Sequence, residues 1–234
     1  MKNKEFPLLE ALKDLDRELG RAGAAEFELK VVGEFALLLN DIRKDPKAYT
    51  SIEYLGMDFE DAVREAIKKV GLKHHLGADW INNDFLLAGS TEEDLEFTTG
   101  KLHFNQALSL PVIQVSAIEK LDLLRMKVIM IDAEASALDY GGDFTREMDL
   151  KDIVLLAQNL SVNLSKYLTS LEDEGFIVDD KTIPLIEDYE RSGECHFEQI
   201  AKHERMGTLP DYDEEEPFGN GSDVESVIEK LEQM

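Results

Sequence analysis

The chain of 234 residues has few of the features that mark a secreted or membrane protein. Its one cysteine, Cys195, excludes an intrachain disulfide, and such a chain suits a reducing compartment. Its longest apolar run, Phe35 to Leu39, is far shorter than the roughly 20 residues that a membrane-spanning helix needs. Residues 1–10 carry charges and no apolar stretch, so we expect no secretion signal. We therefore expect a cytoplasmic protein.

Basic side chains are also scarce. The chain has 25 Lys and Arg against 50 Asp and Glu, which gives a net charge of −25. Because nucleic-acid binding depends on cationic side chains that displace counterions from phosphates, this balance disfavours a nucleic-acid partner. Two explanations stay open: the acidic surface keeps the protein soluble, or it binds a basic protein partner.

The chain does contain alternating strand and helix patterns. Residues 27–32 end in two valines before Gly33, and residues 34–40 return to helical spacing, which predicts a strand, a tight turn and a helix. We expect Gly71 to end a later helix. The other expected helices lie at 6–19, 59–70, 118–131, 150–160 and 164–171, and the other expected strands at 51–55, 94–98, 101–108 and 112–115.

This order predicts an α/β (α+β) protein with a small mixed sheet, flanking helices and a helical C-terminal half. We expect an α/β head at 1–116 and a helical region packed on it at 117–210. Residues 211–234 hold nine acidic residues and one lysine, which indicates an acidic tail with a short terminal helix at 224–231.

Four segments then follow one another in an order known from one family. They are VVGEFAL at 31–37, YTSIEYL at 49–55, the strand and helix at 111–128 that contain Lys127, and REMDLKDI at 146–153. Over about residues 27–156 the chain resembles the nucleotidyltransferases of the abortive-infection toxin class (the AbiEii class and its uncharacterised relatives).

The resemblance implies a nucleotidyltransferase-like fold, Mg²⁺ and a nucleoside triphosphate as cofactors, and a cognate antitoxin as protein partner. It assigns Gly33 to the turn that approaches the triphosphate and Ser51 and Glu53 to the acidic pair on the next strand. Nucleotidyl transfer is an in-line displacement helped by two metal ions, and Mg²⁺ prefers carboxylate oxygens, which two positions on one strand face can supply together.

The chain departs from the family's pattern at two of these positions. Glu34 stands where the family has a second glycine, so its carboxylate would repel phosphates. Ser51 stands where the family has the first acid, which leaves Glu53 as the only candidate metal ligand of the pair. Both departures suggest a degraded catalytic site.

Four further residues match the family's later motifs. Functionally, Lys127 would contact phosphate, and Arg146, Asp149 and Asp152 would complete a polar site, since Asp149 and Asp152 lie on one helix face. The alternative is that Asp149 caps the helix that follows, Asp152 lies in its first turn, and Arg146 and Lys127 are surface charges.

The sequence leaves three functions open. The first is a nucleotidyltransferase-fold protein of toxin–antitoxin type that has lost catalysis and acts as a binding or regulatory protein. The second is an active Mg²⁺-dependent enzyme that moves a nucleoside monophosphate from a nucleoside triphosphate to an RNA or protein acceptor. In that enzyme Glu53, Lys127, Asp149 and Asp152 would be catalytic. The third is an accessory protein with no nucleotide site.

Overall fold

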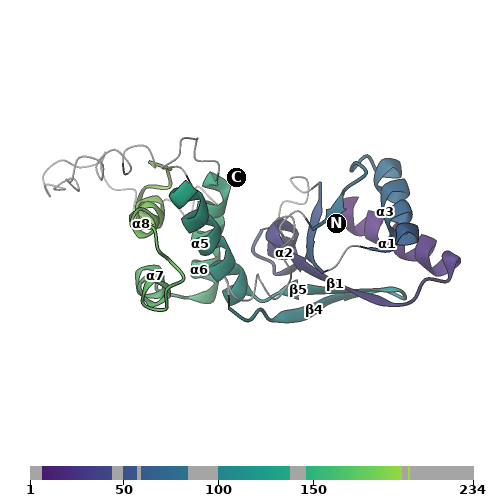
Figure 1. Cartoon of the computed structure of the whole chain (residues 1–234), viewed down its shortest axis with the longest axis horizontal. Coiled ribbons are helices and arrows are strands. Elements are labelled where there is room, and N and C mark those ends of the chain that lie inside the picture. Colours follow the sequence, from purple (N-terminus) through teal and green to yellow (C-terminus); the bar gives the residue numbers. More distant parts are fainter. Residues whose placement is uncertain are drawn as a thin grey trace, which may run out of the picture. The chain divides into compact units, whose positions relative to one another are not determined.

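A computed structural model describes residues 7–43, 50–56, 59–83, 100–137, 146–196 and residue 200 (Figure 1). The chain divides into two compact units, residues 1–123 and residues 124–234. Within the described residues, all the strands lie in the first unit, and the regular elements of the second unit are helices. The predicted order of a mixed sheet with flanking helices and then a helical half is therefore confirmed.

The first unit is built on a five-stranded mixed sheet in the order β3-β2-β1-β5-β4. β1 pairs antiparallel with β2 and parallel with β5, while β2 pairs parallel with β3 and β4 pairs antiparallel with β5. The strands are β1 (Phe27–Val32), β2 (Ile52–Leu55), β3 (Ile81–Asn82), β4 (Phe104–Ser109) and β5 (Ile113–Ile118).

Alternating side chains give one face of this sheet its apolar character. Leu29 and Val31 of β1 are fully buried, and their register partners Val115 and Ala117 on β5 are buried beside them. Tyr54, the partner of Val31 on β2, stacks on Phe59 with ring centroids 4.6 Å apart. These cross-strand apolar pairs fix the register, because a slip by one residue would turn the apolar set to the other face.

Two helices of the first unit, α1 (Pro7–Ala22) and α3 (Asp61–Lys73), pack against each other. α1 buries a stripe of four leucines at helical spacing, Leu8, Leu12, Leu15 and Leu19. Its buried Asp16 accepts hydrogen bonds from the backbone amides of Val112 and Ile113, at 2.8 and 3.0 Å. This carboxylate therefore ties α1 to the start of β5.

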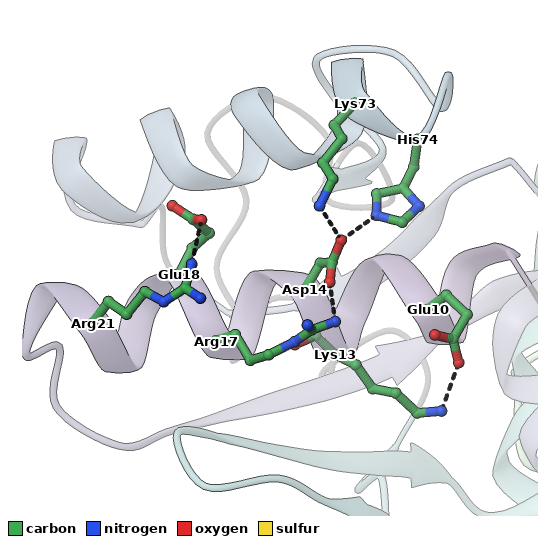
Figure 2. A network of polar contacts seen from close by, with 8 residues as sticks. All are labelled: Glu10, Lys13, Asp14, Arg17, Glu18, Arg21, Lys73 and His74. Atoms are coloured by element: carbon green, nitrogen blue, oxygen red, sulfur yellow. Dashed lines mark hydrogen bonds and ion pairs between the residues drawn. The ribbon is translucent and has the colours of Figure 1, made fainter.

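Polar contacts reinforce the pairing of the two helices (Figure 2). Asp14 of α1 lies 2.5 Å from Lys73 Nζ and 2.7 Å from His74 Nε2, and it also contacts Arg17. Together, the hydrogen bonds from Lys73 and His74 lower the pKa of Asp14 from 3.8 to about 2. The carboxylate of Asp14 is thus held in its charged form between α1 and the end of α3.

Trp80 is buried against α3. Its indole is 1% exposed, and Nε1 donates a hydrogen bond of 2.8 Å to the carbonyl of Ile67. Gly71 lies directly beside it, inside α3, where a Cβ would meet the indole. The prediction that Gly71 ends this helix is wrong, because α3 runs on to Lys73. Glycine is needed inside the helix, since a Cβ would collide with the backbone carbonyl of Gly77 and with the indole of Trp80.

The remaining helices complete the described chain. α2 (Gly33–Leu39) follows β1 directly and contacts β1 and β2. α5 (Lys120–Ala137) follows β5, and the division between the two units falls within it, after Leu123. The second unit continues with α6 (Glu147–Leu160), α7 (Leu164–Asp173) and α8 (Thr182–Ser192).

α8 contacts both α6 and α7, and a buried carboxylate fixes its start. Asp132 of α5 accepts hydrogen bonds from the amide of Asp179 at 3.0 Å and from the hydroxyl of Thr182 at 2.7 Å. α8 and the short strand β3 were not expected from the sequence. The expected strand at 94–98 and the acidic tail at 211–234 lie outside the described residues, and the domain limits at 116 and 210 stay predictions.

Candidate functional site

The turn between β1 and α2 brings together two of the predicted site residues. Gly33 has φ +62°, a left-handed conformation that glycine adopts readily. Glu53, on β2, is the register neighbour of Val32, and its side chain lies against the α-carbon of Gly33. A Cβ on Gly33 would collide with the Glu53 carboxylate and lie 2.9 Å from its Cδ. The backbone conformation therefore favours glycine at this position, and the flexible side chain of Glu53 would also have to move to admit a Cβ.

Two more polar residues lie close by in the sheet: Ser51 directly before β2, and Asn82 on β3. Ser51 comes two residues before Glu53, and the period of an extended chain directs both side chains to the same face. Asn82 of β3 is the register partner of Glu53. Sequence reasoning missed Asn82, because a two-residue strand leaves no periodic pattern, and a pair of asparagines is equally typical of a loop.

The donor set at this turn is poor in charge. Gly33, Ser51, Glu53 and Asn82 together supply one carboxylate, one hydroxyl and one amide as side-chain groups. Within the part of the chain that the structure describes, no three His, Cys, Asp or Glu side chains are grouped closely enough to hold a metal ion. One carboxylate does not fit a two-metal centre, since each Mg²⁺ is normally held by one or two carboxylates.

The helix after the turn also differs from a phosphate-binding helix. α2 has only seven residues, its N-cap residue Val32 makes no side-chain capping bond, and Glu34 is exposed in its first turn. The carboxylate of Glu34 thus stands at the helix end where backbone amides would face an anion. A negative side chain there stabilises the helix dipole but competes with a phosphate for the same positive potential.

Lys127, Asp149 and Asp152 form a second group, inside the second unit. Lys127 of α5 forms ion pairs with Asp149 and with Asp152, at 2.8 Å from Asp152 Oδ2. The side chains of Lys127 and Asp152 are 7% and 0% exposed. The interpretation of Lys127 as a surface charge is therefore wrong. Its ammonium group lies inside the helical unit and is satisfied by two carboxylates.

The electrostatics of this group are those of a closed ion cluster. Burial by itself lowers the pKa of Lys127, but the charges of Asp152 and Asp149 outweigh the burial and raise it. Burial likewise raises the pKa of Asp149, but Lys127 and Arg146 outweigh it and hold the pKa below the ordinary value. Lys127 and Asp149 thus hold each other in the charged form against the effect of burial.

Arg146 extends the cluster toward solvent. It is the N-cap residue of α6, and its Nη1 donates to Asp149 Oδ2 at 2.8 Å, while its Nε lies 4.0 Å from Glu134. Asp149 lies inside the first turn of α6 and does not cap the helix, so the capping alternative is wrong. The side chain of Arg146 is 33% exposed and is the most accessible of the four predicted residues.

The two groups of predicted residues belong to different units. Gly33, Ser51 and Glu53 lie in residues 1–123, and the Lys127 cluster lies in residues 124–234. No protein-family model, curated protein or solved structure matches the chain. None of the helices in the described ranges is both long and apolar enough to cross a membrane.

Three histidines contact carboxylates. His74 lies against Asp14, His103 Nδ1 lies 2.9 Å from Asp122 Oδ2, and His196 Nδ1 lies 2.7 Å from Asp188 Oδ2. In each case the partner is an aspartate on a helix, so these rings link a chain segment to a helix. Cys195, next to His196, is half-buried and forms no disulfide.

Proposed function

We propose that the chain is a nucleotidyltransferase-fold protein of toxin–antitoxin type whose catalytic site is degraded and which acts as a binding or regulatory protein. The observation that carries the proposal is the β1–α2 turn, where Glu34 follows Gly33 and the carboxylate of Glu53 packs against the turn. The position of Glu53 beside the glycine turn suits the resembled fold. The carboxylate of Glu34 does not suit a triphosphate, however, and the single carboxylate of Glu53 does not suit two Mg²⁺ ions.

The neighbourhood of Gly33 and Glu53 supports the resemblance in its geometry. A glycine turn joins β1 to α2, β2 lies next to β1, and the second position of the family's acidic pair lies beside the glycine. An acidic position inherited from such a family would account for the carboxylate of Glu53 beside this turn.

The Lys127 cluster gives a second, separate argument for the loss of catalysis. Two carboxylates already neutralise the ammonium of Lys127, which is almost fully buried. To contact a phosphate, this lysine would have to withdraw its charge from the fully buried carboxylate of Asp152 and leave Asp149 with Arg146, at a cost of several kcal/mol. The cluster therefore acts as a structural ion network in the helical unit.

The net charge of −25 favours a basic protein as the partner. An acidic protein attracts a basic one over a distance of about a Debye length, which speeds association and makes it sensitive to salt. Nucleic acid is disfavoured for the same reason. A cognate antitoxin with an excess of Lys and Arg would meet this requirement.

The test compares nucleotide binding by the wild-type protein with binding by a repaired variant. Thermal shifts are measured with each nucleoside triphosphate, with and without Mg²⁺ or Mn²⁺. The repaired variant is Glu34→Gly with Ser51→Asp, and its matched control is Glu34→Gly with Ser51→Asn, which has the same shape without the charge. A ligand at a hundredfold excess over its Kd stabilises the folded state by roughly 2.7 kcal/mol.

We expect no metal-dependent shift for the wild-type protein and the control, and a shift for the repaired variant. A metal-dependent shift in the wild-type protein that Glu53→Ala abolishes would favour the active enzyme, and a labelled-transfer assay would follow. If neither the wild-type protein nor the repaired variant binds a nucleotide, the assignment of Ser51 and Glu53 to the family's acidic pair is wrong.

A further inference from the structure

β4 forms one edge of the sheet in the first unit (Figure 1). Among the residues that the structure describes, β4 pairs with β5 on one side and with no strand on the other. Four of its six side chains are exposed: Asn105, Gln106, Ala107 and Ser109. An edge strand of this length presents main-chain amides and carbonyls that can pair with another chain.

The hydrogen-bond pattern identifies the main-chain groups on the open side. The amide of Glu119 donates to the carbonyl of His103 at 2.8 Å, and the amide of Leu110 donates to the carbonyl of Ile113 at 3.0 Å. Because paired and unpaired positions alternate along an antiparallel ladder, the main-chain groups of Phe104 and Gln106 point away from β5. The register shifts between Gln106 and Leu108, and beyond this shift the main-chain groups of Ser109 also point away from β5.

The chemistry of β4 is unusual for this chain. The strand FNQALS contains no charged residue, although 32% of the whole chain is charged. Natural edge strands are commonly protected by charged side chains or proline, and β4 has neither. The side chains of Gln106 and Ser109 instead make uncharged hydrogen bonds to Gln114 of β5, at 3.1 and 2.7 Å.

We propose that β4 is the contact surface between two copies of this chain, which pair antiparallel along it and join their sheets. Two chains of charge −25 repel each other, and a neutral edge is where their backbones can approach without facing like charges. A basic partner would find no carboxylate on β4. Two identical amide-bearing strands are complementary to each other about a two-fold axis.

The contact is small, so the dimer is weak. An edge of six residues buries less than the roughly 1,200 Å² of a standard interface, and we expect dimers only at concentrations on the order of 100 µM. Salt should strengthen the association, because it screens the repulsion between two acidic chains.

The experiment is sedimentation equilibrium of the full chain at rising concentration in low and high NaCl. We expect the mass to rise from 26.4 kDa toward twice that value, and to rise further in high salt. Gln106→Pro removes an amide that points away from β5, and Asn105→Lys places like charges across the contact, so each variant should stay monomeric. Gln158→Lys, the same class of change at an exposed position of α6, should behave as the wild-type protein.

Amide hydrogen exchange gives a second measurement that does not depend on the variants. The amides of Phe104 and Gln106 should exchange more slowly at high than at low protein concentration, whereas that of Asn105, which faces β5, should not change. The proposal is overturned if the wild-type protein stays at monomer mass throughout, if Asn105→Lys dimerises as well as Gln158→Lys, or if salt weakens the association.

Discussion

At the residue scale, Lys127 illustrates how burial and charge oppose each other. An isolated ammonium in the protein interior would lose its proton or carry water with it, and Lys127 does neither because Asp149 and Asp152 surround it. Such clusters add little net stability compared with apolar residues of the same volume. Removal of one member, however, leaves the others buried without compensation, and that is costly.

We therefore expect Lys127→Met to destabilise the protein by on the order of 3 kcal/mol, because it leaves the fully buried carboxylate of Asp152 without the cation of Lys127, whereas Asp149 keeps its pair with Arg146. Urea unfolding followed by circular dichroism measures this loss. Lys166→Met, at an exposed position of α7, is the control and should change the free energy of unfolding by less than about 0.5 kcal/mol. Equal effects of the two substitutions would show that the cluster contributes nothing to stability.

A second residue with two constraints at once is Gly33. Its positive φ disfavours any other residue, and its α-carbon packs against Glu53. Gly23 provides a natural comparison, because it has φ +71° and no atom within 4 Å of the position of a Cβ. The two glycines share the backbone constraint and differ only in packing.

Gly33→Ala should therefore destabilise the protein more than Gly23→Ala, which we expect to cost about 1 kcal/mol for the backbone alone. In a Glu53→Ala background the extra cost at Gly33 should shrink, because the colliding carboxylate is gone. A double-mutant cycle by urea unfolding measures this coupling. An unchanged cost in the Glu53→Ala background would mean that the side chain of Glu53 does not limit this position.

At the element scale, Asp14 holds α1 and α3 together (Figure 2). The folded-state pKa of Asp14 is about 2, below its ordinary value of 3.8. A carboxyl group with a lowered folded-state pKa contributes stability that is present above its unfolded pKa and is lost as the pH falls through the folded pKa. The stabilisation by Asp14 is thus complete above about pH 4 and is lost toward pH 2.

Asp14→Asn should lower the free energy of unfolding near pH 6, because it removes the contacts with Lys73 and His74. The loss should be only about 1 kcal/mol, because solvent screens these contacts. It should also flatten the loss of stability between pH 4 and about pH 2. Unfolding by urea at a series of pH values measures both effects. Glu10→Gln, which removes the exposed pair with Lys13 on the same helix, should leave both the stability and its pH dependence nearly unchanged. If the free energy of unfolding of Asp14→Asn falls as steeply between pH 4 and about pH 2 as that of the wild-type protein, Asp14 is not the group that causes this loss.

At the scale of the whole molecule, the net charge of −25 is the main source of long-range electrostatic energy. Acidic residues outnumber basic ones by two to one, so repulsion among the carboxylates exceeds their attraction to the cationic side chains at long range. Self-repulsion of this kind favours expanded states over the compact fold. Because it acts at long range, salt reduces it more than it reduces the short ion pairs.

The melting temperature should therefore rise by several degrees when NaCl increases from about 10 mM to 200 mM, as the Debye length falls from about 30 Å to below 10 Å. Differential scanning calorimetry at low micromolar concentration, where the β4 contact is dissociated, measures the shift. Sucrose at matched osmolality controls for solvent effects unrelated to charge. A melting temperature that is flat or falls with salt would mean that attractive ion pairs outweigh the net repulsion.

The strong periodic segments could be predicted from the sequence. The leucine stripe of α1, the alternation of β1 before Gly33, and the long helical stretch of α5 all appear in the structure, because each pattern is set by local side-chain period alone. β3 could not be predicted, since its two residues form a strand only through pairing with β2. α8 was missed because its start depends on Asp132, fifty residues earlier in the chain.

The candidate site, too, could be predicted only in part from the sequence. The family resemblance singled out Gly33 and Glu53 in two separate segments, and their contact follows from the register of β1 with β2. It also identified Lys127, Asp149 and Asp152. Whether those three face solvent or the interior depends on the packing of α5 against α6, and a helical spacing of three is compatible with either.

By itself the sequence determined the composition, the order of strands and helices, the glycine at the β1–α2 turn and the excess of negative charge. These properties are local or additive, so no distant contact is needed to obtain them. The tertiary structure alone decided that Lys127 is buried between two carboxylates, that Glu53 packs on Gly33 and that β4 is an edge among the described strands. Each of these depends on how segments far apart in the chain are arranged. Burial and pairing are properties of the folded arrangement, and the same residue pattern can occur on the surface or in the core.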